Sequence, residues 1–84
     1  MAWSVQWTDQ AIRDLTSLDP SVARRIVTKL DQAAEQPERF FRRLAGAADH
    51  KLRVGDYRVL AALDHEARMI LVERVGQRSV VYDR

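Results

Sequence analysis

The stretch Lys51-Leu52-Arg53-Val54-Gly55-Asp56-Tyr57-Arg58-Val59-Leu60 decides the fold, because it predicts two strands joined by a two-residue turn. Glycine tolerates positive φ and aspartate tolerates the left-handed region, so Gly55 and Asp56 supply the chemistry of a tight hairpin turn. This turn predicts a register with the cross-strand pairs Val54–Tyr57, Arg53–Arg58, Leu52–Val59 and Lys51–Leu60.

The predicted hairpin has one apolar and one basic face, since side chains alternate across a strand. The apolar face holds Leu52, Val54, Tyr57, Val59, Ala61 and Leu63, and the basic face holds Lys51, Arg53 and Arg58. Like charges directly opposite each other cost roughly 0.2–1 kcal/mol. Two interpretations stay open at this point: the basic face binds an anion, or its charges are simply solvated.

The composition fits one small domain over residues 1–84. The chain has no cysteine, so we expect neither disulfides nor a thiolate metal site. No apolar run approaches the roughly 20 residues that span a bilayer, and the first residues do not follow the pattern of a signal peptide. We therefore expect a soluble, cytoplasmic protein without membrane contacts.

The net charge of +2 is unevenly distributed. Residues 1–36 carry four basic and five acidic side chains, whereas residues 37–84 carry ten basic and seven acidic ones. Only two of the fourteen basic residues are lysines. An arginine-rich segment favours planar, bidentate recognition of phosphate or carboxylate, which indicates nucleic acid or an acidic protein as the partner.

The residues before the hairpin predict a strand and two helices. Residues 2–8 alternate, and their Trp3, Val5 and Trp7 are expected in the core rather than stacked on bases. Thr8 or Asp9 caps a first helix, and Asp19-Pro20 begins a second that ends at Pro37. The apolar helix positions are Ala11, Ile12, Leu15 and Leu18, then Val22, Ala23, Ile26, Val27, Leu30, Ala33 and Ala34. A second anion site at Arg24, Arg25 and Lys29 is weighed against an ordinary solvated helix face.

The segment from Pro37 to Asp49 is irregular in pattern; in it Phe40 or Phe41 is expected to fold back onto the helices. After the hairpin, Asp64-His65-Glu66-Ala67 predicts a turn into an apolar strand from Met69 to Val75, which Gly76 ends. Either Glu73 or Arg74 would lie opposite Arg58, and residues 77–82 would form an edge strand or tail. The fold class is α+β: an N-terminal strand, an αα-hairpin and an antiparallel meander of three or four strands in one sheet, with the helices on one face.

The chain lacks the motifs of several site types. It has no glycine-rich phosphate loop, no nucleophile elbow, and no His, Asp and Glu spacing that suits a metal. The acidic residues fall mainly on predicted turns and helix faces, which disfavours a two-carboxylate hydrolase. What remains is a basic sheet face with Lys51, Arg53, Arg58, Arg78 and the phenol of Tyr82. Such a cluster can cleave RNA without metal or cofactor, because it positions the 2′-hydroxyl and stabilises charge on the phosphate.

Three segments resemble the RelE toxins of the RelE/ParE toxin–antitoxin superfamily. They are Arg43-Leu44-Ala45-Gly46, then Lys51 to Val59, then Val75-Gly76-Gln77-Arg78 with Val81-Tyr82. The resemblance spans nearly the whole chain and implies a RelE-like, microbial-ribonuclease-type fold. It also implies an endoribonuclease that cuts mRNA in the ribosomal A site, and a cognate antitoxin that neutralises it.

The resemblance also assigns roles to residues. Arg58 and Arg78 would stabilise the phosphorane, Lys51 and Tyr82 would transfer protons, and Arg53 would bind RNA. Arg42 and Arg43 are RNA-binding candidates on separate grounds, because they lie in the arginine-rich segment before the hairpin and most contacts to nucleic acid go to the phosphate backbone. Neighbouring cations would have to lower the pKa of Lys51 for this side chain to serve as a base. The chain departs from the family pattern in two places: Gln77 stands where many relatives have histidine, and Asp49 and His50 occupy the neighbourhood of a second lysine.

Two other functions fit the same fold. One is a ParE-like toxin that poisons DNA gyrase and cleaves no RNA, against which the Arg78 and Tyr82 tail argues. The other is a non-catalytic module whose basic face binds RNA or protein, with an affinity for RNA that falls steeply with salt.

Overall fold

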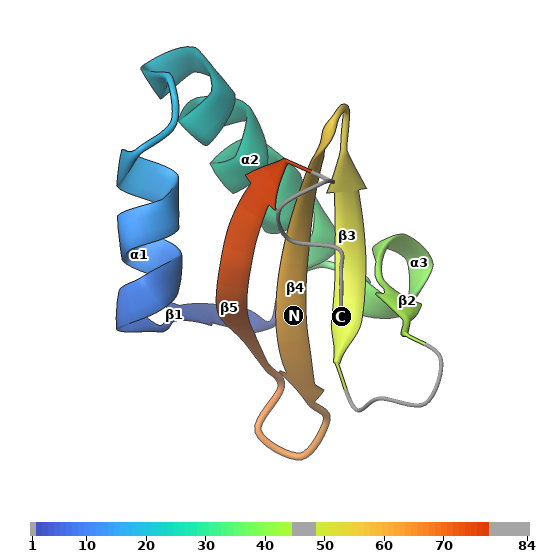
Figure 1. Ribbon diagram of the computed structural model, residues 1–84. Coiled ribbons are helices and arrows are strands. Elements are labelled where there is room, and N and C mark those ends of the chain that lie inside the picture. Colours follow the sequence, from blue (N-terminus) through green and yellow to red (C-terminus); the bar gives the residue numbers. More distant parts are fainter. Residues whose placement is uncertain (1, 45–48, 78–84) are drawn as a thin grey trace.

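The protein folds as a twisted sheet with helices on one side (Figure 1). The computed structural model describes residues 2–44 and 49–77. Strand order within this part is β1-β5-β4-β3-β2, with β1 parallel to β5 and the other neighbours antiparallel. The predicted α+β class is confirmed. The elements are β1 (Ser4–Trp7), α1 (Asp9–Thr16), α2 (Pro20–Ala33), α3 (Pro37–Phe40), β2 (Arg42–Arg43), β3 (His50–Val54), β4 (Tyr57–Asp64) and β5 (Met69–Gln77).

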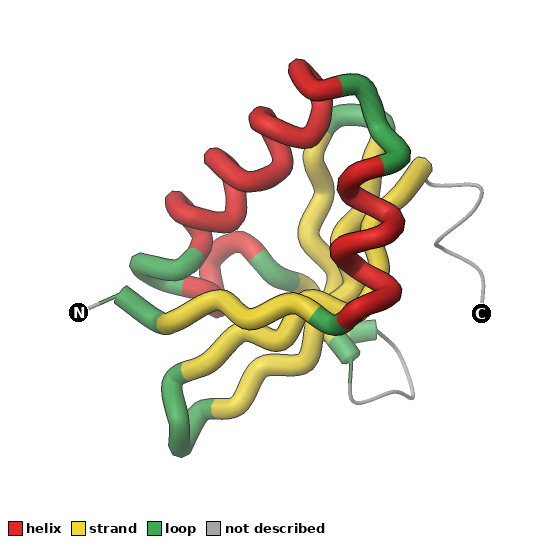
Figure 2. The backbone as a smooth tube through the Cα atoms, turned by 90° about the vertical axis from the view of Figure 1, so that its left-hand side faces the viewer, coloured by secondary structure: helices red, strands yellow, loops and turns green. Residues whose placement is uncertain are grey.

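The two main helices begin at the residues that the sequence favours. Thr8 is the N-cap of α1, and its hydroxyl accepts the backbone N–H of Ala11 at 3.1 Å. Asp19 is the N-cap residue of α2, and Pro20 takes the first helical position, where its missing N–H leaves no bond unmade. Figures 1 and 2 show α2 across the back of the sheet and α1 alongside β5.

The hydrophobic core lies between α2 and the sheet. Its largest fully buried side chains are Ile26, Leu30, Leu52, Val59, Ile70 and Val72. Trp3, Val5 and Trp7 pack against this core half-buried, as the alternation of residues 2–8 predicts. Two helix residues expected in the core are instead exposed, Ile12 by 47% and Val27 by 38%.

The segment after α2 is more ordered than its sequence indicates. Pro37 does not end the second helix: α2 already ends at Ala33, and Pro37 opens the short helix α3. A proline at the first helical position costs no hydrogen bond, so it starts this turn as readily as it would stop one. Phe41 is 5% exposed in the core, whereas Phe40 lies half-buried with the Lys29 ammonium 5.2 Å from its ring centroid.

The register of β5 differs from both predicted alternatives. The hairpin closes with Asp64 opposite Met69, and a β-bulge adds Glu73 to β5 beside Leu60 and Ala61. Gly76, rather than Glu73 or Arg74, therefore lies opposite Arg58. Gly76 also lies within β5 instead of ending it. Gln77 is the last residue of β5, and the rest of the predicted edge strand lies outside the described residues.

Candidate functional site

The β3–β4 hairpin has the predicted register, with Arg53 directly opposite Arg58. Gly55 adopts φ +60 in the turn, the conformation for which glycine is favoured. Because Leu52 and Val59 are buried under the helices, alternation places the arginines on the opposite side of the sheet. We call this side, with Lys51, Arg53 and Arg58, the basic face; it is the side of β3 and β4 turned away from α2 in Figure 1.

Arg58 is the one buried charged side chain among the described residues, with 6% of its surface exposed. Its Nη1 donates to the carbonyl oxygens of Tyr57 at 3.1 Å and Gly55 at 3.4 Å. Its Nε is buried and has no hydrogen-bond partner within the described residues. A buried donor without a partner typically costs about 1–3 kcal/mol. Arg58 is therefore not a solvated charge, and its free donor suits an anion.

The neighbours of Arg58 on the two adjacent strands are a glycine and an arginine. Gly76 lies opposite it on β5 and has no side chain, while Arg53 on β3 is exposed. A Cβ on Gly55 would lie 2.8 Å from Nη2 of Arg25, so this α2 guanidinium lies against the hairpin turn. Arg25 thus places a cation at the hairpin turn, although the sequence alone favours a solvated face for this part of α2.

The other predicted site residues are distributed along the sheet edge. Arg42 lies opposite Lys51 and Arg43 opposite His50, in the short strand β2. Both β2 arginines are exposed, whereas Lys51 is half-buried. Arg78 and Tyr82 lie outside the described residues, so their predicted roles stay predictions.

Asp49 and Glu73 are far apart in the chain, but their carboxyl groups lie close enough on the sheet to affect each other. Both side chains are half-buried. Burial, the neighbouring charge of Asp49 and a side-chain hydrogen bond with Asp49 together raise the pKa of Glu73 above its ordinary value. From the sequence, acidic residues are expected mainly on turns and helix faces. The position of Glu73 beside Asp49 could not be predicted, because the bulge at Glu73 has no local signature.

Residues of the N-terminal half hold the bulge in place. The Thr8 hydroxyl donates to the Glu73 carbonyl at 3.3 Å, and the Thr8 N–H donates to the Val72 carbonyl at 3.0 Å. Oδ2 of Asp14 accepts from Nε of Arg74 at 2.8 Å and from the Val75 N–H at 2.9 Å. Burial alone would raise the pKa of Asp14, but these hydrogen bonds, with a smaller one from Gln10, outweigh it and lower the pKa.

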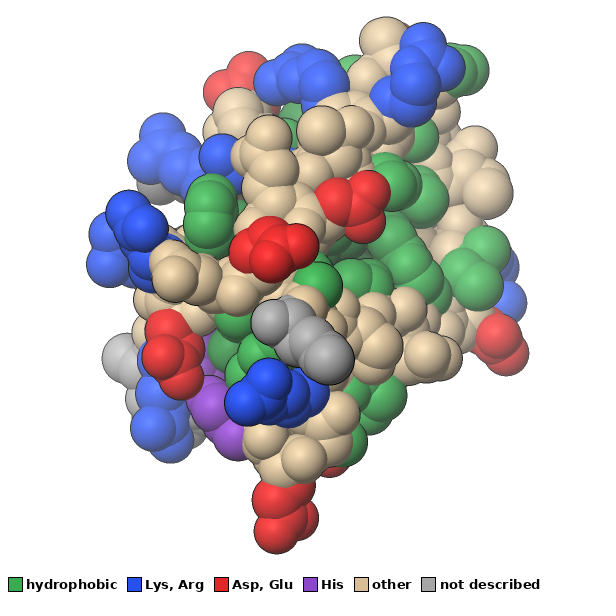
Figure 3. Space-filling view, turned by 180° about the vertical axis from the view of Figure 1, so that it is seen from behind, with side chains coloured by type: hydrophobic (Ala, Val, Ile, Leu, Met, Phe, Trp, Pro, Cys, Tyr) green, Lys and Arg blue, Asp and Glu red, His purple; other side chains and the backbone are tan. Residues whose placement is uncertain are grey.

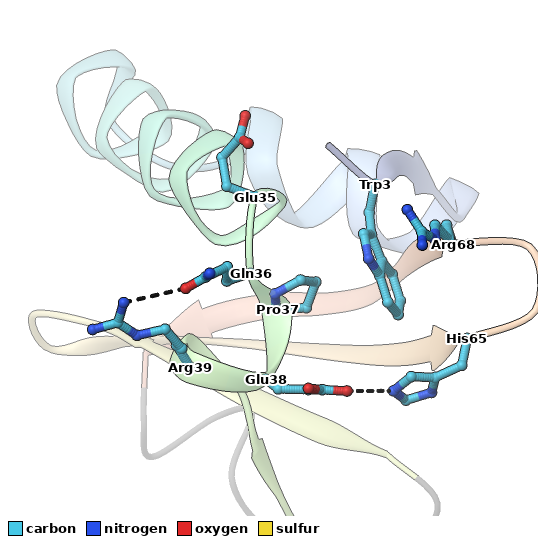
Figure 4. Close-up of a pocket in the computed structure, with 8 residues that line it drawn as sticks. All are labelled: Trp3, Glu35, Gln36, Pro37, Glu38, Arg39, His65 and Arg68. Atoms are coloured by element: carbon cyan, nitrogen blue, oxygen red, sulfur yellow. Dashed lines mark hydrogen bonds and ion pairs between the residues drawn. The ribbon is translucent and has the colours of Figure 1, made fainter. Parts of the chain in front are cut away.

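A hollow of about 630 Å³ lies at the other end of the sheet, between the start of β1, α3 and the β4–β5 turn (Figure 4). Its polar side chains are largely engaged with one another: His65 contacts Glu38 at 3.1 Å, and Arg39 donates to Gln36 at 3.2 Å. Trp3 meets the His65 ring edge-on at 5.1 Å between centroids. The hollow is separate from the basic face, which lies toward the Gly55 turn.

Within residues 2–44 and 49–77, no three His, Cys, Asp or Glu side chains are grouped so that they could hold a metal ion. In the same part of the chain, no helix has the length and apolar character needed to cross a membrane.

The sequence also matches a known family over nearly its whole length. The family is described as the ParE toxin of the type II toxin–antitoxin system parDE, and the match covers residues 5–82. The chain belongs to this toxin family. It is therefore a toxin of the RelE/ParE superfamily, as the resemblance in the hairpin and in the Val75–Arg78 segment implied. The comparison with curated proteins gives no match.

Solved structures similar to this toxin include both bacterial and archaeal proteins. One is a chain of the RelBE2 toxin–antitoxin complex of Mycobacterium tuberculosis, with 28% identity, a TM-score of 0.84, and coverage of 93% of this chain and 100% of that one. Another belongs to the RelE–RelB complex of Pyrococcus horikoshii, with 26% identity, a TM-score of 0.77, and coverage of 93% and 97%. Free E. coli RelE, at 24% identity and a TM-score of 0.80 over 96% and 88% of the chains, shares the fold.

Proposed function

We propose that this toxin is a ribosome-dependent endoribonuclease that cuts mRNA in the A site by attack of the 2′-hydroxyl on the adjacent phosphate, without metal. The observation that carries the proposal is the buried Arg58, whose Nε has no partner in the described residues and whose opposite neighbour is a glycine. A preorganised donor of this kind stabilises charge that develops on a phosphoryl group. Arg78, Lys51 and Tyr82 are assigned with it to catalysis.

The remaining basic residues are proposed to hold the RNA. Arg42, Arg43 and Arg53 are exposed along β2 and β3, where a phosphate backbone can reach them. Most contacts between proteins and nucleic acids are of this positioning type, and they make affinity fall with salt. A cognate antitoxin is the expected protein partner, because the chain belongs to a toxin–antitoxin family and its structural relatives were solved as complexes with RelB.

The test is cleavage of mRNA on programmed ribosomes, followed by analysis of the product ends. We expect products with a 2′,3′-cyclic phosphate and a 5′-hydroxyl, and formation of the same products by a minimal reaction in EDTA if the ribosome itself stays intact. Arg39→Ala is the control, since Arg39 is exposed on α3 and donates to Gln36 away from the basic face. An intact mRNA after incubation with folded toxin would contradict the proposal.

A second candidate function is poisoning of DNA gyrase, and the family match favours it, because the matching family is that of ParE toxins. A supercoiling assay with purified gyrase separates the two functions. Inhibition of supercoiling together with intact mRNA on ribosomes would establish the gyrase target. Cleaved mRNA with normal supercoiling would establish the ribonuclease.

A further inference from the structure

Arg25 of α2 lies at the tip of the β3–β4 hairpin, although it comes from the helical layer of the fold. A Cβ built on Gly55 would lie 2.8 Å from Nη2 and 4.0 Å from Cζ of Arg25. The guanidinium therefore rests against the turn at the point where glycine has no side chain. The Arg25 side chain is nevertheless exposed, so a ligand can reach it.

Arg58 contacts the same turn residue from the strand that follows it. Its Nη1 donates to the Gly55 carbonyl oxygen at 3.4 Å, and its buried Nε has no partner in the described residues. Arg53 lies directly opposite Arg58 and is exposed. Three arginines, one each from α2, β3 and β4, therefore lie at one short turn.

No carboxylate forms an ion pair with any of these three arginines within residues 2–44 and 49–77. Asp56, the exposed acidic residue of the turn, is among the carboxylates that do not. Like charges placed close together repel each other, and a bound polyanion removes this repulsion. Together with the buried Nε of Arg58, the three arginines indicate a ligand with more than one negative charge.

The structure separates the cations of α2 that the sequence groups together. Lys29 follows Arg25 by one helical turn, and its Nζ lies 5.2 Å from the ring centroid of Phe40 in α3. Arg24 is exposed like Arg25, but successive residues of a helix are rotated by about 100°, so its side chain leaves α2 in another direction. Arg24 is therefore a matched control for Arg25, with the same charge on the same helix.

We propose that Arg25 is a further RNA-binding residue, which contacts a backbone phosphate next to the one at Arg58. The role rests on the ribonuclease function proposed above. An RNA strand that reaches Arg58 passes the turn against which Arg25 lies, and guanidinium groups bind phosphate oxygens in pairs. Arg25 takes no part in bond breaking; it holds the strand so that the phosphate to be cut stays at Arg58. The RNA-binding surface then continues from Arg53 around the turn to α2.

The experiment measures how the affinity for programmed ribosomes depends on salt. The A-site nucleotides of the mRNA lack the 2′-hydroxyl, so the mRNA is not cut during the measurement. Loss of one phosphate contact lowers the slope of log K against log salt by about 0.7–0.9. We expect this loss for Arg25→Ala, so that between 50 and 200 mM salt its affinity falls roughly threefold less than that of wild type. Arg24→Ala should keep the wild-type slope, and so should Arg25→Lys, which retains the charge.

Single-turnover cleavage of ordinary mRNA separates binding from catalysis. At saturating toxin Arg25→Ala should cut at a rate close to wild type, because its contact is made equally in the ground state and the transition state. The source of the phosphate is found with ribosomes that carry no mRNA. An effect that persists there assigns Arg25 to ribosomal RNA, and an effect confined to programmed ribosomes assigns it to mRNA. Thermal unfolding of each variant checks that the fold is intact.

Three results would overturn the proposal. Arg25→Ala could bind ribosomes with the affinity and salt slope of wild type, or it could change them no more than Arg24→Ala does. The third result is weaker antitoxin binding with unchanged ribosome binding, which would assign Arg25 to an acidic protein segment. In each case wild type still cuts mRNA, so the ribonuclease function stands. A wild type that leaves mRNA intact in the same reactions would remove that function and the proposal together.

Discussion

Arg58 differs from the other arginines of the basic face in that it is buried. Exposed arginines such as Arg42 and Arg53 are hydrated and lose little when no anion is bound. Arg58 is 94% buried, with Nη1 bonded to its own hairpin, and its Nε lacks a partner in the described residues. The Arg58 side chain loses its hydration when the chain folds. A phosphate bound at this position would supply the missing hydrogen bond without a further desolvation cost.

Asp14 should contribute stability that depends on pH in a definite direction. Its pKa is lowered in the fold, so its contribution is complete above its ordinary value of 3.8 and is lost as the pH falls through the lower, folded value. Asp14→Asn should cost on the order of 1 kcal/mol at pH 7, because Arg74 is 43% exposed and screening limits the ion pair. Urea unfolding at pH 7 and pH 2.5 measures this; an equal loss at both pH values would contradict the ion-pair account. Asp31→Asn, on the exposed face of α2, is the control.

Glu73 should have the opposite effect. Its pKa is raised by burial and by Asp49, so the ionised side chain destabilises the fold at neutral pH. At pH values above the folded pKa of Glu73, Glu73→Gln should raise the melting temperature. This gain should disappear as the pH falls toward the ordinary value of 4.5. Thermal unfolding across pH 4 to 8 tests this.

At the scale of elements, the β3–β4 turn depends on one glycine. Gly55 has φ +60, which costs other residues about 1–2 kcal/mol. Gly55→Ala should lower the free energy of unfolding by about that amount, with a small further cost because its Cβ would meet the flexible end of Arg25. Gly55→Asn should lose less, since asparagine tolerates the left-handed region. Urea titration of the three proteins measures the order; an alanine variant as stable as wild type would show that the turn relaxes.

The two hairpins differ in how far sequence predicts them. The Gly55-Asp56 turn and the alternation around it are local, so every pair of the β3–β4 register was predicted correctly. The β4–β5 register depends on the bulge at Glu73, which Thr8 and Asp14 hold from 65 and 60 residues away. Such contacts form only in the folded chain, which is why the partner of Arg58 and the Asp49–Glu73 pair could not be predicted. The place of Pro37 could not be predicted for a different reason, because proline is found both after one helix and at the start of the next.

At the scale of the whole molecule, the two sides of the sheet have different surfaces. Figure 3 shows the helix side, which carries a band of apolar side chains among charges of both signs. The basic face lies on the other side of the sheet and includes the exposed Arg53. Ile12 of α1 and Val27 of α2 are exposed members of the helix side. An amphipathic antitoxin segment would contact these apolar side chains, whereas an acidic segment would bind the basic face.

Ile12→Asp and Val27→Asp test the apolar side as an antitoxin contact. Each replaces an exposed apolar side chain, so the fold should tolerate it, and loss of a buried apolar contact at an interface should weaken antitoxin binding by roughly tenfold or more. Binding is measured by titration with the cognate antitoxin. The exposed position Thr28→Asp is the matched control on α2. Unchanged affinity in both variants would place the antitoxin elsewhere, with the basic face as the next candidate.

The role of Arg58 in cleavage is tested by the single-turnover rate of Arg58→Ala on programmed ribosomes, measured together with its affinity for the ribosome. Interactions made only in the transition state lower the rate and leave binding nearly unchanged. We predict a loss of about 10²–10³ in rate with ribosome and antitoxin affinity close to wild type. A wild-type rate, or weaker binding with an unchanged rate at saturation, would rule out transition-state stabilisation by Arg58, because Arg58 would then only hold RNA.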